Sequence, residues 1–553
     1  MSLPSNTRLP PILAWMAAGL LLIAAAWVIP VNLKSVTPAL LKAAGEGTPS
    51  VARLGRELLD SEKSGPAALA LAAARSLGDR QADSLAAALD RVSQRRPELV
   101  PWGGWDPFLD PIFNLKDNAG HRDSTPVLTF FITEKARTSL RDYLANSRSD
   151  GVQSILRLRT LDHTGRFVPA NQPGGQALDA VLLLGALLYQ GEHLSTPLQR
   201  ELRGLADTAA EQRSLGDLEP VCIDLLSLGR RLNWLQLCEL LSVTDSTKAV
   251  GEFAQLARAT PDDLPLIYSA ALLSGSADQV ATYLLRYGHA GMADLKLALL
   301  LGEGAVNQLL LRQVPVNHQP SPSFGPATLL ALLYPKLALA AKYLGFLLGA
   351  FFIFRGLDRV LFDPRLDAAT HPHVKSGVLA VLTAGMLVLA TEPFLLKPAP
   401  PSEFQLKLTV PVLANLSDPA SLTHVDNTFS MDTSTLLSIG FFAILQVGMY
   451  LLCLAKMREI DLQQIPALLK LRLMENEENL FDGGLYIGIA GTATALVLQV
   501  LKVIEPNLLA AYSSNLFGII CVALVKIRHV RPFKRRLILE SQGAETDKPA
   551  VTA

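Results

Sequence analysis

Five side chains between positions 106 and 123 are of the types that can bind a hard metal ion. They are Asp106, Asp110, Asp117, His121 and Asp123, in an irregular stretch that also carries two tryptophans. Their spacing matches no metal-binding loop motif, and aspartates in such stretches commonly cap turns. We therefore expect turn capping here and assign no metal ligand. An enzyme working in this part of the chain would need a deep pocket beside these residues.

Motifs for catalysis and nucleotide binding are absent from the sequence. It contains no P-loop, no G-x-G-x-x-G, no H-E-x-x-H, no G-x-S-x-G and no C-x-x-C. The formal net charge is +0, which gives no electrostatic signature of nucleic-acid binding. We therefore expect no enzymatic activity, no catalytic residue and no cofactor.

The four cysteines exclude a disulfide-rich scaffold. Cys222 and Cys238 both lie in apolar runs, which favours buried free thiols, although an oxidising compartment would permit a disulfide between them. Cys453 and Cys521 lie in long apolar stretches and are expected to pack as small apolar residues.

Half of the residues are hydrophobic and the mean hydropathy is +0.29, which is high for a soluble protein of 553 residues. A helix that crosses the membrane core needs about 20 apolar residues. Six stretches meet this requirement: residues 12–29, 327–354, 376–396, 435–455, 485–503 and 507–527. The first follows one basic residue, Arg8, and lacks a small-residue cleavage site, which indicates an uncleaved signal anchor.

Lysines and arginines are distributed unevenly between the loops. Four lie between the second and third segments, four between the fourth and fifth, and six at or after the end of the sixth. The opposite loops hold or border three, Lys397, Lys407 and Lys502. Because cationic loops stay in the cytoplasm, we predict a multi-pass protein of the cell (inner) membrane with both termini cytoplasmic.

This topology divides the chain into an anchor at 1–30, an outside domain at 31–326 and a five-helix membrane domain at 327–530. The outside domain would be periplasmic in a Gram-negative bacterium. Within the membrane domain we expect an outside loop at 397–434 and a cytoplasmic amphipathic stretch at 456–484, lying along the membrane surface. The tail at 531–553 is basic at first, and after Ser541 it is expected to be disordered.

Polar side chains inside the predicted spans are costly, so they are candidates for function. They are Lys336, Lys342, Glu392, Gln446, Gln499 and Asn515. Lys336 and Glu392 are expected at similar depth and could form an ion pair. One interpretation is a polar path for an ion or proton. The other, which we favour because no acidic group lies near the midplane, is interhelical hydrogen bonding with snorkelling lysines.

The outside domain is expected to be mainly α-helical with a small α/β element. Runs at 127–132 and 154–161 have the composition of strands, and a helix is expected at 134–146 between them. Another strand is expected at 404–410, packed on the run at 127–132. Leucine-rich fragments that end at Gly229, Gly275 and Gly302 suit an irregular solenoid; the alternative is an ordinary helical domain with glycine C-caps.

The helix pair at 485–527 contains the stretch Gly488-Ile489-Ala490-Gly491-Thr492, with one outgoing and one returning helix and a basic tail that follows. In these features it resembles the MotA/TolQ/ExbB proton-channel family. The resemblance implies that Thr492 corresponds to the pore threonine of that family. Asn515 stands near the position at which the family usually has threonine.

The sequence thus predicts a mainly α protein, with a multi-span transmembrane bundle and a large extracytoplasmic helical domain. We expect a non-enzymatic scaffold whose partners are the lipid bilayer and a protein bound by the outside domain, with no nucleic acid. The alternative is a component of an ion channel or transporter with a polar path through the bundle.

Overall fold

The structure, a computed structural model, describes residues 9–115, 123–318, 324–361, 372–395, 433–500 and 508–546. Over these ranges the chain is mainly α-helical and contains no strand, which confirms the predicted class. It divides into two compact units. One is formed by the described part of Pro38–Val316, and the other by the described parts of Met1–Thr37, Asn317–Pro398 and Val410–Ala553.

The predicted α/β element is wrong. The run expected as a strand at 127–132 forms helix α7, Val127–Phe131, and the run at 154–161 lies in α9, Asp150–Arg157, and a 3-10 turn at Leu158–Thr160. Val127, Leu128 and Phe131 are all buried. A short apolar run of this kind carries no period that separates a buried strand from a buried helix. The third predicted strand, at 404–410, lies outside the described residues.

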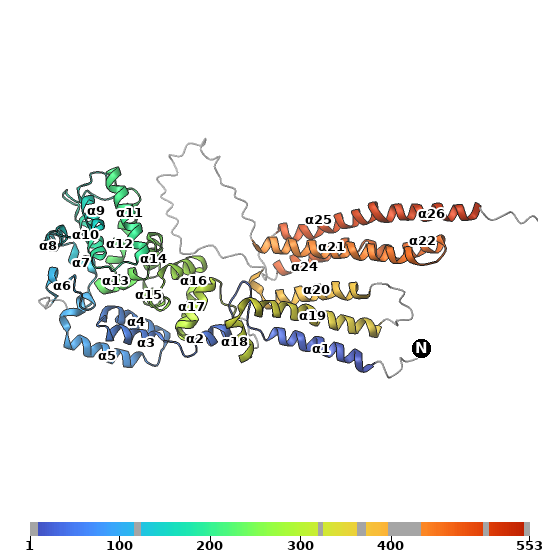
Figure 1. Ribbon diagram of the computed structural model, residues 1–553, viewed down its shortest axis with the longest axis horizontal. Coiled ribbons are helices and arrows are strands. Elements are labelled where there is room, and N and C mark those ends of the chain that lie inside the picture. The colour runs from blue at the N-terminus through green and yellow to red at the C-terminus, as the bar shows by residue number, and fades with distance from the viewer. Residues whose placement is uncertain are drawn as a thin grey trace, which may run out of the picture. The chain divides into compact units, whose positions relative to one another are not determined.

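The unit within Pro38–Val316, here the helical unit, consists mostly of short helices (Figure 1). Besides α7 and α9 they are α2 Pro38–Gly45, α3 Val51–Asp60, α4 Ser64–Leu77, α5 Ala82–Arg95, α6 Asp110–Phe113, α8 Glu134–Ala145, α10 Gln176–Gln190, α11 Thr196–Gln212, α12 Leu218–Gly229, α13 Trp234–Ser242, α14 Thr247–Ala259, α15 Leu264–Ser274, α16 Ala277–Leu301 and α17 Glu303–Arg312. Several begin at polar N-caps; Asn233 and Gln236 form a full capping box at the start of α13.

Alternate helices of this unit pack against each other. Helix α10 contacts α12, α12 contacts α14, and α14 contacts α16, while α13, α15 and α17 form a second row. The N-terminal helices close the end of the stack, because α4 packs on α15 and α2 packs on α17. Helix α10 lies inside the unit, with every residue from Leu178 to Leu188 buried. Its hydrophobicity is therefore explained by the core of the unit.

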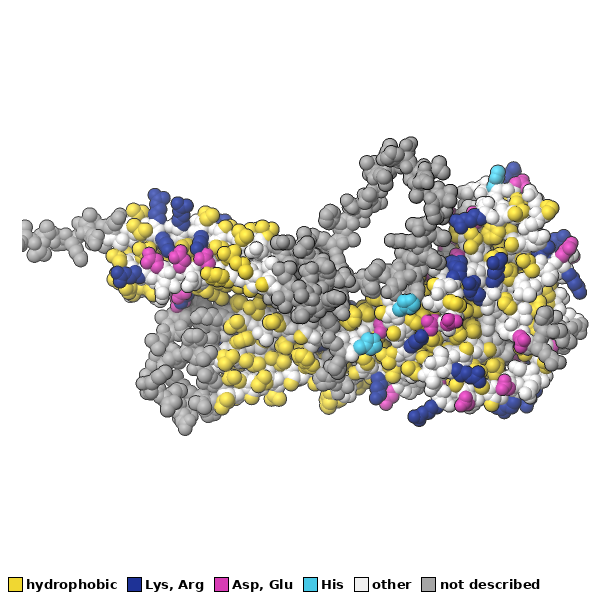
Figure 2. All heavy atoms as spheres, turned by 180° about the vertical axis from the view of Figure 1, so that it is seen from behind, with side chains coloured by type: hydrophobic (Ala, Val, Ile, Leu, Met, Phe, Trp, Pro, Cys, Tyr) yellow, Lys and Arg dark blue, Asp and Glu magenta, His cyan; other side chains and the backbone are white. Residues whose placement is uncertain are grey.

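The second unit contains the remaining helices. They are α1 Leu9–Trp27, α18 Gly325–Leu333, α19 Pro335–Leu361, α20 Pro372–Thr391, α21 Thr433–Leu462, α22 Ala467–Asn476, α23 Glu478–Phe481, α24 Gly483–Val500, α25 Leu508–Ala523, the π-helical turn η7 Leu524–Val530, and α26 Arg531–Thr546. Helix α19 packs between α1 and α20, and α25 packs on α21 and α24 (Figure 1). The visible face of the α1, α19 and α20 group is covered by hydrophobic side chains (Figure 2).

Small residues set the close approach of α1 and α19. A Cβ atom added at Gly19 would lie 2.6 Å from the carbonyl oxygen of Gly349, and one added at Gly349 would lie 2.7 Å from that of Gly19. One turn away, a Cβ at Gly345 would lie 2.8 Å from Ala26 Cβ. Gly345 and Gly349 form a G-x-x-x-G pair, which is typical of helices that associate in membranes.

Helices are present at the positions of all six predicted spans. Among the described residues, however, a single helix is both long enough and apolar enough to cross a membrane. It is Pro335–Leu357 of α19, with a mean hydropathy of 2.0. Shorter apolar stretches are Leu13–Trp27 in α1 and Ser376–Thr391 in α20, besides the buried α10. The multi-span arrangement therefore remains a proposal.

Two predicted boundaries are revised, and a third lies outside the described residues. The second predicted span, 327–354, is broken at Tyr334 into α18 and α19, because Pro335 has no N–H to continue a helix and suits a helix start. The tail expected to be disordered after Ser541 remains helical to Thr546, as the end of α26. The predicted loop at 397–434 lies almost entirely outside the described residues.

Candidate functional site

A buried lysine in the apolar helix α19 is the most unusual charged group of the second unit. Lys342 is 3% exposed. Its ammonium donates hydrogen bonds to the carbonyl oxygen of Val31, at 2.8 Å, and to Asn32 Oδ1, at 2.7 Å. Both acceptors follow the C-terminal end of α1. Two of the three ammonium donors are thus satisfied by neutral groups with strong, charge-assisted geometry.

Glu392, directly after α20, is the matching buried acid and is 0% exposed. Its carboxylate accepts a hydrogen bond from the Tyr343 hydroxyl at 2.6 Å and from the backbone N–H of Leu33 at 2.9 Å. Among the described residues the acid and Lys342 form no direct ion pair. The backbone of residues 31–33 links the two charges. The Val31 carbonyl accepts a hydrogen bond from Lys342, and the Leu33 N–H donates one to Glu392.

The segment that carries these backbone groups is held in a turn by its own side chains. Val31 and Val36 form an isolated antiparallel bridge. Asn32 Nδ2 donates to Ser35 Oγ at 2.9 Å, and Thr37 Oγ1 donates to the carbonyl oxygen of Pro30 at 2.9 Å. The turn is therefore pre-shaped to present its carbonyl and amide groups to α19 and α20.

A second chain segment joins the same place. The backbone N–H of Asn317 donates to the Val36 carbonyl at 2.8 Å, and Asn317 Nδ2 donates to the Thr391 carbonyl at 3.3 Å. We name the set of Asn32, Asn317, Lys342, Tyr343 and Glu392 the polar clasp. It ties together three helices and the two segments, around positions 36 and 317, through which the chain passes into and out of the helical unit.

The predicted pairing of Lys336 with Glu392 is wrong. Lys336 lies in the first turn of α19 and is exposed. The acid is held instead by Tyr343, about two helical turns beyond Lys336, and by a segment more than 350 residues away in sequence. Similar depth along the helices suggested the pairing of Lys336 with the acid, but the groups that contact Glu392 are the Tyr343 hydroxyl and the Leu33 amide.

The other predicted polar residues lie on α21, α24 and α25. Gln446 is buried and donates from Nε2 to the Gly484 carbonyl at 3.0 Å, while Thr492 Oγ1 donates to the Gly488 carbonyl of its own helix at 3.0 Å. Within the described part of the chain, Gln446 Oε1 and Asn515 Oδ1 are buried without a hydrogen-bond partner. The side chain of Gln499 lies outside the described residues.

Glycines bring α24 and α25 together in the same region. A Cβ atom at Gly491 would lie 2.4 Å from Ser514 Oγ, and one at Gly518 would lie 2.6 Å from the Gly484 carbonyl. Thus the glycines of the Gly-x-x-Gly-Thr stretch serve close helix packing. Thr492 is bonded along its helix, and Asn515 follows a serine that packs against the glycines.

In the helical unit, two of the acidic residues near the tryptophans, Asp106 and Asp110, cap backbone amides, as expected. Asp106 Oδ1 accepts from the N–H groups of Phe108 at 2.8 Å and Leu109 at 3.0 Å, and Asp110 accepts from Leu115. Asp117 and His121 lie outside the described residues. No group of three metal-ligating side chains occurs in the described part of the chain.

Asp106 also has a partner that the sequence did not indicate. His193 Nε2 lies 3.0 Å from Asp106 Oδ2, and both side chains are largely buried. Burial by itself raises the pKa of the Asp106 carboxyl, but His193, Trp234 and the Phe108 amide outweigh it and lower the pKa below its ordinary value. This carboxylate is therefore ionised at neutral pH, where it caps two backbone amides and lies beside the His193 ring.

A buried charge cluster supports α10. Asp179, on α10, accepts from Arg137 of α8 at 2.8 Å and from Arg159 at 2.6 Å. The aspartate side chain is 5% exposed and the arginines are 17% and 22% exposed. Such an arrangement is paired and hydrogen-bonded, as a buried charge must be.

All four cysteines are free and buried, so Cys222 and Cys238 do not form a disulfide. Burial, together with the charge of Glu219, raises the pKa of the Cys222 thiol to about 12. Burial also raises the pKa of Cys238, helped by the nearby Asp106 carboxylate. Both thiols are thus unreactive structural groups.

No family model, no curated protein and no solved structure matches this chain.

Proposed function

We propose that this chain is a non-enzymatic, multi-pass protein of the cell membrane, whose outside helical domain binds a protein partner. The observation that carries the proposal is that both charged groups of the polar clasp are engaged in hydrogen bonds within their own unit. Lys342 and Glu392 each have two short hydrogen bonds to neighbouring groups of the same unit. Charges used in this way hold helices together; they are not free to pass an ion or proton along.

The position of the clasp supports an anchoring role for these helices. It binds the segment that leaves α1 and the segment that returns before α18, and these two segments bound the helical unit in sequence. An anchor that displays a domain needs both connections secured. The uneven distribution of Lys and Arg supports the placement of the helical unit outside the cytoplasm.

The packing of alternate helices supports partner binding as the role of the helical unit. Stacked helix pairs, as in solenoid proteins, form extended surfaces that commonly bind other proteins. Of the candidate aspartates, Asp106 caps a turn and lies beside His193, and Asp110 caps a turn. We therefore assign the unit to binding.

A channel component is the second candidate, and one observation favours it. The buried amide oxygens of Gln446 and Asn515 have no hydrogen-bond partner within the described residues. Asn515 lies in the helix pair 485–527, which resembles the MotA/TolQ/ExbB family. Buried acceptors of this kind can receive water or a protonated group. Against this, Thr492 is bonded to its own helix.

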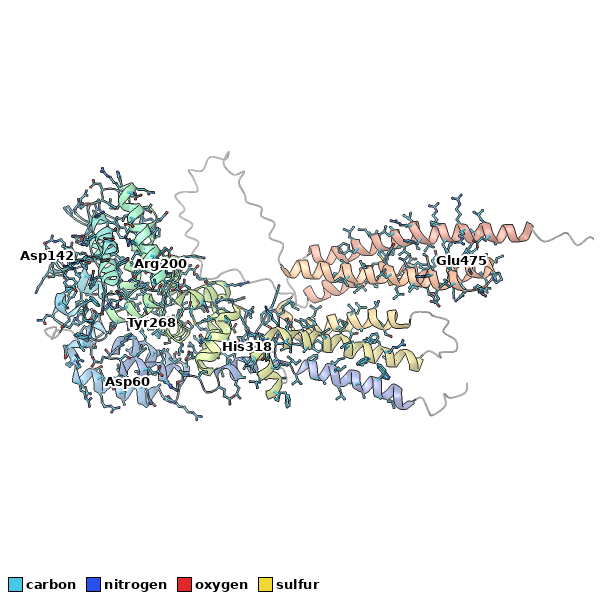
Figure 3. All side chains as sticks on the ribbon, viewed as in Figure 1. Asp60, Asp142, Arg200, Tyr268, His318 and Glu475 are labelled. Carbon is cyan, nitrogen blue, oxygen red and sulfur yellow. The ribbon has the colours of Figure 1, made fainter. Side chains whose placement is uncertain are left out.

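Site-directed labelling tests the proposed topology. Arg200, on α11, and Glu475, on α22, are exposed in their units (Figure 3), and the native cysteines are buried. We expect a membrane-impermeant maleimide to label Arg200→Cys on intact cells whose outer barrier has been removed, and to label Glu475→Cys only after the membrane is opened. Asp142→Cys, on α8, is a matched outside control. Labelling of Glu475→Cys but not Arg200→Cys on sealed cells would overturn the proposal.

A second experiment separates the anchor from the channel. The full chain in sealed proteoliposomes is assayed for proton and cation flux, alongside Thr492→Leu and Asn515→Leu. We expect no flux above that of empty vesicles. Flux in the wild type that Thr492→Leu abolishes, in a protein that is still inserted, would establish the channel and refute the anchor.

A further inference from the structure

Basic side chains gather where the last long helix leaves its apolar stretch. Helix α25 continues without a break through η7 into α26, and this stretch carries Lys526, Arg528, Arg531, Lys534, Arg535 and Arg536. Charged side chains gather over α22 and α26 in Figure 2. Directly before them, the surface of α25 is apolar, with Leu516, Ile519 and Ile520 each about half exposed.

Two hollows flank this stretch and share the same residues. One, of about 880 Å³, is lined by Ile527, Arg531, Pro532, Arg535, Arg536, Leu539 and Glu540. The other, of about 530 Å³, shares Ile527, Arg531, Arg535 and Leu539, and adds residues of α23 that include Glu478. The four shared residues are spaced four apart, so they form one stripe along the helix. In chain order, the stripe begins with the apolar Ile527, continues with two arginines and ends with the apolar Leu539.

The two arginines of the stripe line both hollows, and no carboxylate described there neutralises them. Lys526 pairs with Asp482 at 2.7 Å and lies 4.0 Å from Glu478, and Arg536 pairs with Glu540 at 2.8 Å. In the described part of the chain, neither Arg531 nor Arg535 has a carboxylate within ion-pair distance. Both are exposed, and Ile527 beside them is 68% exposed.

We propose that this stripe binds an anionic phospholipid, with its phosphate between Arg531 and Arg535 and its acyl chain along Ile527 and α25. The inference rests on the proposed membrane location of α25. The two arginine Cα atoms are about 6 Å apart along the helix axis, at about 1.5 Å per residue, so both guanidinium groups can reach one phosphate. Guanidinium forks bind phosphate oxygens through paired hydrogen bonds.

The order of residues favours a lipid over a soluble phosphate compound. Ile527 lies one helical turn before Arg531, on the side of the apolar α25, so the apolar and cationic groups follow each other as the tail and headgroup of a lipid do. Cationic clusters directly beyond a membrane helix attract anionic headgroups. A soluble phosphate compound would make no use of Ile527, which remains exposed.

The proposal is tested by lipid binding to the full chain, purified in detergent and delipidated. Native mass spectrometry gives the affinity for phosphatidylglycerol and, separately, for zwitterionic phosphatidylcholine. The variant is Arg531→Gln/Arg535→Gln, which keeps helix propensity. The matched control is Arg458→Gln/Arg472→Gln, which removes two exposed cations from α21 and α22, outside both hollows.

We expect the wild type to prefer phosphatidylglycerol, and the Arg531/Arg535 variant to bind it roughly ten- to thirty-fold more weakly at low salt. The control should change by less than about twofold, since its cations lie away from the stripe. An equal loss in both variants would reduce the effect to net charge and overturn the site. Full competition by millimolar inorganic phosphate would assign the stripe to a soluble anion and overturn the lipid.

Failure of the membrane proposal itself is recognised separately. Alkaline carbonate extracts peripheral proteins from membranes and leaves integral ones. Release of the wild-type chain would refute the proposed function. A chain that stays in the membrane but shows no preference for phosphatidylglycerol would refute this inference alone.

Discussion

Removing the charge of Asp179 is expected to open the helical unit locally around α10. In Asp179→Asn the side chain keeps its size, but Arg137 and Arg159 lose their shared carboxylate while remaining about four-fifths buried. Breaking a buried pair by removing one partner costs about 3–5 kcal/mol. Because both arginines retain some contact with water, we take the lower limit, about 3 kcal/mol, which corresponds to a factor of roughly 150 in an opening equilibrium.

Hydrogen exchange measured by mass spectrometry on the full chain in detergent reports this opening peptide by peptide. Amides of α8 and α10 in Asp179→Asn should exchange roughly a hundredfold faster than in the wild type. Asp142→Asn is the matched control, since Asp142 is 65% exposed and pairs with its neighbour Arg141. Exposed pairs of this kind contribute about 0–1 kcal/mol, so its exchange should change by less than about fivefold.

A triple variant decides whether the uncompensated charge is the cause. In Asp179→Leu/Arg137→Met/Arg159→Met all three charges are removed together, and apolar replacements of buried charge clusters are often neutral. We expect most of the protection of α10 to return. If Asp179→Asn exchanged no faster than Asp142→Asn, the buried cluster would contribute little and the reasoning would be refuted.

Three further predictions follow from groups described above. Because the pKa of Asp106 is lowered in the fold, its carboxylate stabilises the protein at neutral pH, and this contribution is lost as pH falls through the lowered pKa. Asp106→Asn should therefore lower Tm at neutral pH and make Tm less dependent on acid pH. An acid profile of Tm identical to that of the wild type would contradict this. Gly349→Leu should destabilise the α1–α19 pair by about 1–3 kcal/mol, seen as a lower melting temperature in detergent, whereas Gly377→Leu, with no atom within 4 Å of an added Cβ, should not. At pH 8 the Cys222 thiol, with a pKa of about 12, is ionised in roughly one molecule in ten thousand, so a maleimide should label it only on unfolding; rapid labelling of the native chain would show that the thiol is accessible.

The helical class of this protein and the positions of its long apolar helices could be read from composition and run length, because these signals are local. The break at Tyr334 was also visible in the sequence, since Pro335 lies within the second apolar run and cannot continue a helix. The run at 127–132 was assigned to a strand because its apolar residues are adjacent, and only tertiary packing shows that a short helix buries them.

The candidate site could be predicted in part. Lys342 and Glu392 were identifiable as charges in apolar surroundings, but their partners were not, because Asn32 and Tyr343 are ordinary residues at sequence separations that carry no pattern. Lys336 matches Glu392 in depth along the helices, but an ion pair also depends on the direction of each side chain and on the groups that lie between them. The pairing of Asp106 with His193 was missed for the same reason.

The hydrogen bond between Lys342 and Asn32 joins residues 310 positions apart in the chain, which imposes an order on biosynthesis. At a translation rate of about 5–20 residues per second, the first helix emerges roughly 15–60 s before the helix that completes its packing. During that interval Gly19 has no glycine opposite it, and the carbonyl of Val31 has no ammonium to bind. The nascent α1 therefore has no packing partner while the helical unit is synthesised. Its contacts form only after α19 has been made.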